Sequence, residues 1–256
     1  MRPFTAFRAT TALILREMAT SYGRATGGYL WAILEPVAAV ALLAFVFSLA
    51  FSQPPVGKSF ALFYATGYLP FTLYSDLAQK VGVALRFSRP LLAYPAINWW
   101  DALLARFILN TLTHLVIILL VLGGIIALSE SPVTLNLPRL WFGLWLAAIL
   151  GFGVGALNAF LFEMLPIWER VWAVLNRPLF IVSGILFLPD SVPIPYRDWL
   201  YHNPLVHVIA MVRSGIYPTY KAEFTDPFYV SGIAGSALLL ALIFLGRYAR
   251  RLLAEG

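Results

Sequence analysis

Long apolar runs dominate this sequence, and they restrict the fold more than any other feature. Several of these runs continue for about 20 residues, the length that a helix needs to cross a bilayer. Of the 256 residues, 61% are hydrophobic and only 12% are charged, about half the charged share of a soluble domain, which is roughly 25%. A closed barrel would alternate over segments of about 10 residues. The sequence therefore predicts an all-α integral membrane protein.

Six membrane spans are expected. They cover residues 30–51, 60–77, 107–128, 140–162, 178–188 and 228–246. The fifth is too short to cross about 30 Å of hydrocarbon, so it must extend upstream to Val171 or join a re-entrant piece. The following segment, 189–226, carries four prolines and a short apolar stretch at 205–212. We interpret it as a hairpin that enters the membrane or lies on its surface.

The basic residues predict the orientation of the chain. Of 18 Lys and Arg residues, 13 lie in the N-terminal segment, the loops after spans two and four, and the C-terminus. Basic residues collect on the cytoplasmic side of membrane proteins. We therefore expect both termini and these loops in the cytoplasm. Residues 1–256 form one transmembrane domain, without an internal repeat.

The N-terminal segment, residues 1–29, has an amphipathic pattern. Phe4, Phe7, Ile14 and Met18 share one helical face, and Arg16 lies off that face. Such a helix lies along the cytoplasmic interface of the membrane. The alternative is an ordinary helix before the first span that serves only as an anchor.

The sequence lacks the common motifs for nucleotide binding, metal binding and catalysis. It has no GxxxxGK phosphate loop, no HExxH motif, no Cys/His cluster and no cysteine. We expect neither catalytic residues, nor a bound metal or cofactor, nor a nucleic-acid partner. His114 lies within span three. It is a functional candidate by position, but a neutral imidazole hydrogen-bonded within its helix or to a neighbour is the stronger interpretation.

Two aromatic groups are candidates for a substrate path. In span two, Tyr64, Tyr68 and Tyr74 share one helical face with two phenylalanines. Aromatic rings stack on sugars and hydroxyls bond to sugar oxygens, so this face is a candidate path for a glycan; helix packing is the alternative. After span four, Trp168 and Trp172 share a face and Arg170 lies on another. This pattern suits a short interfacial helix that guides an anionic head group or merely anchors the chain.

Small residues recur at helical spacing in spans four and six. Gly151 and Gly155 repeat at four-residue spacing, as do Gly232 and Ser236. This spacing favours close helix packing, either within the chain or at a dimer interface.

Three ordered stretches resemble the permease subunits of ABC exporters for capsular polysaccharide. They are Arg16–Glu17, Tyr22–Arg24, Gly28–Trp31 and Leu34–Pro36 in the first; Leu91–Pro95, Asp101 and Ala105–Arg106 in the second; and Ser183–Gly184, Asn203–Pro204, His207 and Arg213–Gly215 in the third. Their order and spacing match over nearly the whole chain. Permeases for O-antigen and teichoic acid share this architecture.

The resemblance implies a non-catalytic subunit of the bacterial inner membrane. This subunit works as a homodimer with two cytoplasmic ATPase subunits, which bind ATP and Mg. The loop 78–106 takes the position that couples to the ATPase. Pro90 and Pro95 break helices, which leaves residues 97–107 free to form a short helix. The candidate coupling residues of the loop are Arg89, Leu92, Tyr94, Pro95 and Asp101.

The cargo that the resemblance implies is an acidic polysaccharide on a lipid anchor, passed on to periplasmic and outer-membrane export proteins. The segment after span five would form a re-entrant hairpin on the periplasmic side and gate the exit. Arg16, Arg24, Arg89 and Trp31 are candidate contacts for the cargo. The arginines are equally consistent with a role in topology alone.

Two other functions remain open at this point. A membrane-embedded lipid-glycan transferase would gather acids or histidines at one membrane face, yet the polar groups around Asp101 and His207 are expected on opposite sides. An ABC exporter of a drug or small lipid is set aside only through the resemblance.

Overall fold

The computed structural model describes residues 10–18, 28–92, 94, 97–129 and 134–254. Throughout this part of the chain the regular structure is helical, without a strand. A short helix covers residues 10–18, and the remaining elements follow in order. They are α2 (Gly28–Ala50), α3 (Phe60–Gly82), α4 (Ala84–Leu92), α5 (Trp99–Ala127), α6 (Leu137–Met164), α7 (Pro166–Val182), the 3-10 turn η1 (Pro189–Ser191), α8 (Tyr196–Leu200), α9 (Pro204–Ile216) and α10 (Pro227–Ala254).

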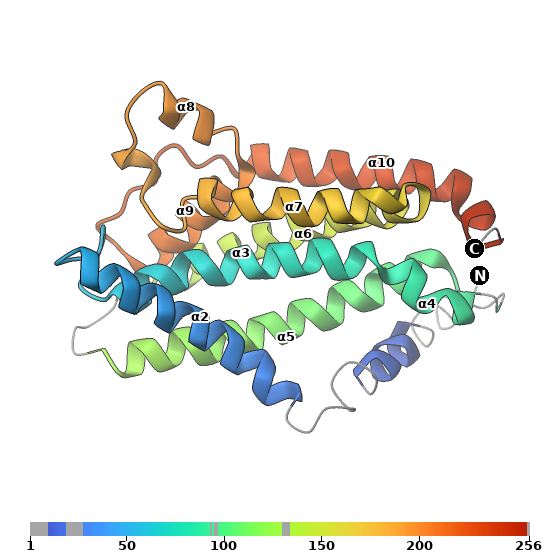
Figure 1. Ribbon diagram of the computed structural model, residues 1–256, viewed down its shortest axis with the longest axis horizontal. Helices are drawn as coiled ribbons and strands as arrows, with labels where there is room; N and C mark the ends of the chain where they lie inside the picture. Colours follow the sequence, from blue (N-terminus) through green and yellow to red (C-terminus); the bar gives the residue numbers. More distant parts are fainter. Residues whose placement is uncertain (1–9, 19–27, 93, 95–96, 130–133, 255–256) are drawn as a thin grey trace.

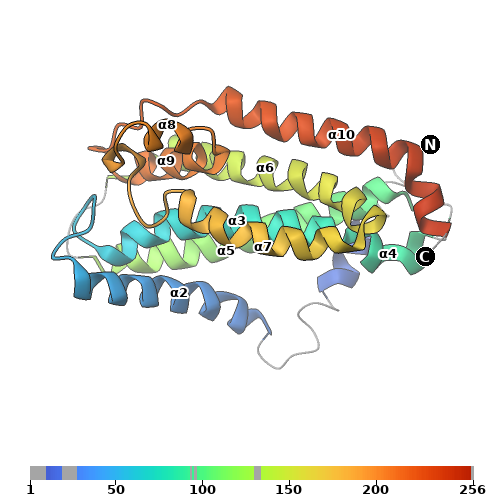
Figure 2. The same cartoon turned by 45° about the horizontal axis from the view of Figure 1, so that its top comes forward.

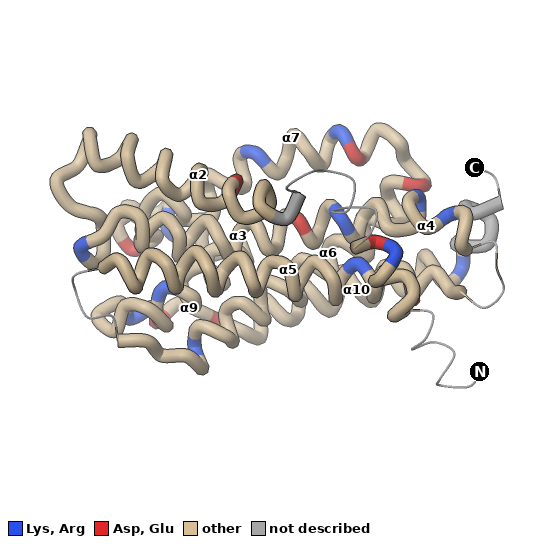
Figure 3. The backbone as a smooth tube through the Cα atoms, turned by 90° about the horizontal axis from the view of Figure 1, so that it is seen from below, with Lys and Arg blue, Asp and Glu red and all other residues tan. Residues whose placement is uncertain are grey.

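The long helices run side by side in one bundle (Figure 1). α2 and α10 lie on opposite sides, with α3 and α6 between them (Figure 2). The helix over 10–18, α4 and the last turns of α10 lie at one end, here called the α4 end; α8 and α9 lie at the other, the α8 end. α5 and α6 carry Asp, Glu, Lys and Arg only near their ends (Figure 3). This distribution suits a bundle whose middle is surrounded by hydrocarbon.

Four helices in the described part of the chain are long and apolar enough to cross a membrane: α2, α5, α6 and α10. These four correspond to expected spans one, three, four and six. Expected spans two and five correspond to α3 and α7, which are not among them. The all-helical class is therefore confirmed, whereas the count of six spans stays a prediction.

The N-terminal turns of α5 and α7 differ from expectation. A separate short helix over 97–107 was expected, but α5 is continuous from Trp99 to Ala127. The segment around Trp168 was expected to be a short interfacial helix, but it forms the first turns of the 17-residue α7. The helix that overlaps expected span five, α7, thus begins upstream of Val171 but ends at Val182. α5 starts at the capping box of Asn98 and Asp101, and α7 starts at Pro166, so each helix begins at a residue suited to its first turn.

α6 packs closely against two neighbours through its glycines. A Cβ added at Gly155 would lie 2.8 Å from the carbonyl oxygen of Leu77 in α3, and one at Gly153 only 2.3 Å from that of Ala234 in α10. Gly151 contacts α3 in the same way, whereas Gly232 has open space around it. The spacing at Gly151 and Gly155 therefore serves packing within the chain.

Candidate functional site

Ion pairs attach α4 to the corner between α6 and α7. Arg86 Nη1 donates to Glu169 Oε2 at 2.8 Å, and Arg86 Nε lies 3.4 Å from Glu163 Oε1. Arg89 Nη2 donates to Glu163 Oε2 at 2.9 Å. The hydrogen bond to Glu169 raises the pKa of the Arg86 guanidinium above its ordinary value. α4 is therefore held to α6 through the largely buried carboxylate of Glu163, and to α7 through Glu169.

The expected coupling residues are spread around this α4 end. Arg89 takes part in the ion pairs, and Leu92 packs at the end of α4 against an apolar cluster of α3, α5, α6 and α10. Tyr94 is exposed, and Pro95 lies outside the described residues. Asp101 is buried, and its Oδ2 accepts a 2.9 Å hydrogen bond from the backbone N–H of Asn98. Asp101 thus caps the start of α5.

Arg106 joins three elements at the same end. Its Nε lies 3.1 Å from Glu17 Oε1 in the helix over 10–18, and its Nη1 donates to the backbone oxygen of Lys80 at 2.8 Å. The guanidinium also lies over the ring of Phe87 in α4, 4.3 Å from its centre. Burial raises the pKa of Glu17, although Arg106 opposes that shift. The helix over 10–18 is therefore tied to α3, α4 and α5 through one buried side chain.

The partners in these contacts were not predicted from the sequence. Arg106 and Glu17 stood only within motif segments, and neither Arg86 nor Glu163 was a candidate. A signal was present, because a lone charge beside an apolar run is costly unless paired. The identity of each partner depended on helix packing.

The expected substrate-path residues do not meet at one place. Arg16 lies 5.6 Å from the Phe87 ring centre at the α4 end, Trp31 is exposed on α2, and Arg24 is outside the described residues. Trp168 donates from Nε1 to Asn158 Oδ1 at 3.1 Å. In α7, Arg170 is exposed and Trp172 is half-buried against the core. The role of these residues in transport stays a prediction.

The tyrosine face of α3 lies largely inside the chain. Tyr64 and Tyr74 are buried, and Tyr64 packs against Phe47 with ring centres 5.0 Å apart. Tyr68 is half-buried with its ring edge toward Phe180. The placement of Tyr64 and Tyr74 favours the packing alternative for those two residues.

Within the bundle, His114 contacts a neighbouring helix. Its Nε2 lies 3.1 Å from Asp76 Oδ2 in α3, and Lys80 Nζ lies 3.3 Å from the same oxygen. This contact matches the structural interpretation of His114, which expected a partner on its own helix or a neighbour.

At the α8 end, Arg213 holds the turn after α7. It is fully buried in α9. Its Nη1 donates to the backbone oxygens of Gly184 at 2.6 Å and Phe187 at 3.2 Å, and its Nη2 to that of Ile185 at 2.8 Å. Gly184 has a φ of +76°, a conformation that favours glycine. Arg213 therefore binds α9 to the connection that precedes α8.

His207 makes a second tie at this end. The backbone N–H of Asp226 donates to its Nδ1 at 3.0 Å, so the proton is on Nε2, which donates to the oxygen of Tyr201 at 2.7 Å. His207 thus links α9 to the segments before it and after it, a structural task that occupies both ring nitrogens.

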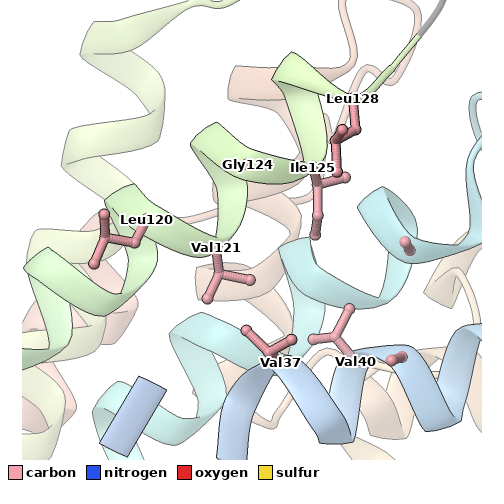
Figure 4. A pocket seen from close by; sticks show the side chains of 9 residues that line it. Val37, Val40, Leu120, Val121, Gly124, Ile125 and Leu128 are labelled. Carbon is pink, nitrogen blue, oxygen red and sulfur yellow. The ribbon is translucent and has the colours of Figure 1, made fainter. Parts of the chain in front are cut away.

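A crevice of about 240 Å³ opens between α2 and α5 (Figure 4). Its lining is aliphatic: Val37, Val40, Ala41, Ala61, Leu120, Val121, Gly124, Ile125 and Leu128. These side chains offer no hydrogen bond to a sugar, so the crevice is not a candidate glycan site.

The chain belongs to the ABC-2 type transporter family, whose sequence profile matches residues 8–217. It is 30% identical over 235 residues to the polysialic acid transport protein KpsM of Escherichia coli, covering 92% of this chain and 89% of that protein. It is 21% identical to the capsule polysaccharide export inner-membrane protein CtrC of Neisseria meningitidis serogroup B, covering 95% and 92%. It is 18% identical to the capsule polysaccharide export inner-membrane protein BexB of Haemophilus influenzae, covering 95% of this chain and 92% of that protein. These likenesses agree with the resemblance found in the sequence.

Proposed function

We propose that this chain is the membrane-spanning subunit of an ATP-driven exporter that moves lipid-linked, acidic capsular polysaccharide across the bacterial inner membrane. The observation that carries the proposal is the likeness to KpsM, a polysialic acid transport protein, along 92% of the chain. In the complex, two copies pair with a cytoplasmic ATPase dimer that binds ATP and Mg. Periplasmic and outer-membrane proteins take the polymer onward.

In this proposal α3 and α7 complete a set of six spans, both termini are cytoplasmic, and α8 and α9 face the periplasm. The positions of Lys and Arg support this orientation. α9, with 13 residues, is too short to cross a bilayer, which supports a re-entrant role at the exit.

The contacts at the α4 end support a route for coupling. An ATPase that displaced α4 would pull on the α6–α7 corner through Glu163, and on the helix over 10–18 through Arg106. A transferase is less well supported, because Asp101 and His207 lie at opposite ends of the bundle and both are engaged in structural hydrogen bonds.

The test is deletion and co-purification. A strain that lacks the gene should accumulate polymer inside the cell, and the tagged chain should co-purify a nucleotide-binding protein with ATPase activity. Analysis of the trapped polymer distinguishes capsule from O-antigen or teichoic acid. Normal surface polymer in the deletion strain, or purification without an ATPase, would refute the proposal.

A further inference from the structure

The outward side of α8 presents large apolar side chains that the rest of the chain leaves uncovered. Tyr196 and Trp199 stand three residues apart on α8, so they share a face, and 66% and 75% of their surfaces are exposed. Ile194, just before α8, is equally exposed. Such a group of side chains on a soluble surface is unfavourable, so its surroundings require an explanation.

The inward side of this segment is fixed to the bundle. The ring of Tyr201 stacks on Phe224 with centres 4.3 Å apart, and the Tyr201 hydroxyl donates to Asp190 Oδ1 at 3.2 Å. The Tyr229 hydroxyl donates to the backbone oxygen of His202 at 2.7 Å. α8 is therefore held with Tyr196 and Trp199 pointing away from the protein.

The contact with Tyr229 also sets the level of α8. Tyr229 lies in the first turn of α10, one of the helices able to span a membrane. Its neighbour Phe228 is 88% exposed. His202, which follows α8, is thus held at this first turn, and α8 lies at the same end of the bundle as the start of α10 (Figures 1 and 2). The proposed function places this end of α10 where the helix enters the hydrocarbon, so α8 lies near the same boundary.

We propose that Tyr196 and Trp199 insert into the head-group boundary of the bilayer, so that α8 is an interfacial anchor for the segment before α9. Trp and Tyr are the residues enriched at this boundary, because one end of each ring is apolar and the other binds water. Arg197 and Asp198 point to other sides of the same short helix, where head groups and water solvate their charges. The exposed face has only a few side chains, which suits a lipid surface better than a contact between two folded copies. The proposal uses the membrane placement of α10 from the proposed function, but not the identity of the cargo.

The absence of cysteine from the sequence makes a direct test possible. Trp199→Cys and Tyr196→Cys are each labelled with a nitroxide in the otherwise unchanged full chain, reconstituted in vesicles of phosphatidylethanolamine and phosphatidylglycerol. Collision with oxygen, which partitions into lipid, is compared with collision with a water-soluble nickel chelate. Phe228→Cys is the reference for a lipid-facing site, and Asp198→Cys is the matched control on the same helix.

The expected result is a higher oxygen than nickel accessibility at positions 199 and 196, as at 228, with the ratio reversed at 198. Preferential access of nickel to position 199 would overturn the proposal, and so would exclusion of both reagents, which would show that a second copy or another protein covers the face. If Trp199→Cys does not fold, Tyr196→Cys reports on the same face. Polymer export by the same variants is measured separately, so a failure of the proposed function is distinguished from a failure of the anchor.

Discussion

Arg106 and Glu17 form a buried ion pair, with Nε and Oε1 separated by 3.1 Å. The pair connects the third turn of α5 to the helix over residues 10–18. Because both side chains are largely withdrawn from solvent, losing one partner leaves the other charge without compensation.

We expect Arg106→Gln to lower the free energy of unfolding by about 3 kcal/mol or more. Glu17→Gln should cost less, because burial already penalises its ionised form. The double variant should lose less than the sum of the single losses, with a coupling energy on the order of 1–3 kcal/mol. The free energy of unfolding of the parent chain, the two single variants and the double variant is measured by denaturant titration in detergent. Simple additivity would contradict the pairing.

The raised pKa of Glu17 predicts a pH dependence. The folded state binds this proton more tightly than the unfolded state, so the contribution of Glu17 to stability is present below its ordinary pKa of 4.5 and is lost as pH rises through the raised value. Unfolding free energies of the parent chain and Glu17→Gln, measured across that window, should differ in slope. Equal slopes for the two proteins would show that the pKa of Glu17 is not raised.

Glu163 joins α4 to α6 through Arg86 and Arg89. We expect Glu163→Gln to reduce stability by only about 1 kcal/mol, because both arginines are partly solvated. If α4 carries motion from the ATPase, polymer export should fall while ATP hydrolysis by the complex continues. The readout is polymer exported per ATP hydrolysed. Glu223→Gln, the same change at an exposed site of the α8 end, should leave this ratio unaltered.

Arg213 supplies hydrogen bonds to three backbone oxygens after α7. Lysine keeps the charge but lacks the planar fork, so Arg213→Lys should cost about 2 kcal/mol through oxygens left without a donor. Protease should then cleave residues 183–203 faster in the native state. The partly exposed Arg197 provides the control. The Arg197→Lys variant should be cleaved at the same rate as the parent chain. Equal cleavage of both variants would show that Arg213 does not hold this turn.

Gly153 allows α6 to approach α10. A methyl group there would meet the Ala234 oxygen at 2.3 Å, so Gly153→Ala should cost about 1–3 kcal/mol. At Gly235, also in α10, the space around an added Cβ is open. Gly235→Ala should therefore be neutral or gain up to about 1 kcal/mol from helix propensity. Thermal unfolding of the Gly153→Ala and Gly235→Ala variants in the same detergent compares their stabilities directly.

The long helices were predictable from sequence because a bilayer demands continuous apolar runs. The start of α5 was also encoded locally, because Asn98 and Asp101 have the spacing of a capping box. The helix-breaking proline at position 95 nevertheless favoured a separate short helix over 97–107. Such local errors arise because a helix-breaking proline and a helix-capping residue lie within a few positions of each other. Only the packed structure shows where the helix begins and how far it continues.

The contacts of the candidate site were less predictable. Arg86 and Glu169 are 83 residues apart in the chain, and no sequence pattern specifies that α4 meets the α6–α7 corner. The tyrosines of α3 show the same difficulty: periodicity placed Tyr64 and Tyr74 on one face, but it did not reveal that other helices of the chain cover that face.

α2 is held to its own chain along only one side, by α3 and α5, and most of its side chains are exposed. Its 23 residues give a length of about 35 Å, a few ångströms more than a typical hydrocarbon core of about 30 Å. A helix in this position relieves hydrophobic mismatch by tilting. Because few contacts with its own chain fix the tilt of α2, a thinner or thicker bilayer should change that tilt, and with it the width of the aliphatic crevice against α5.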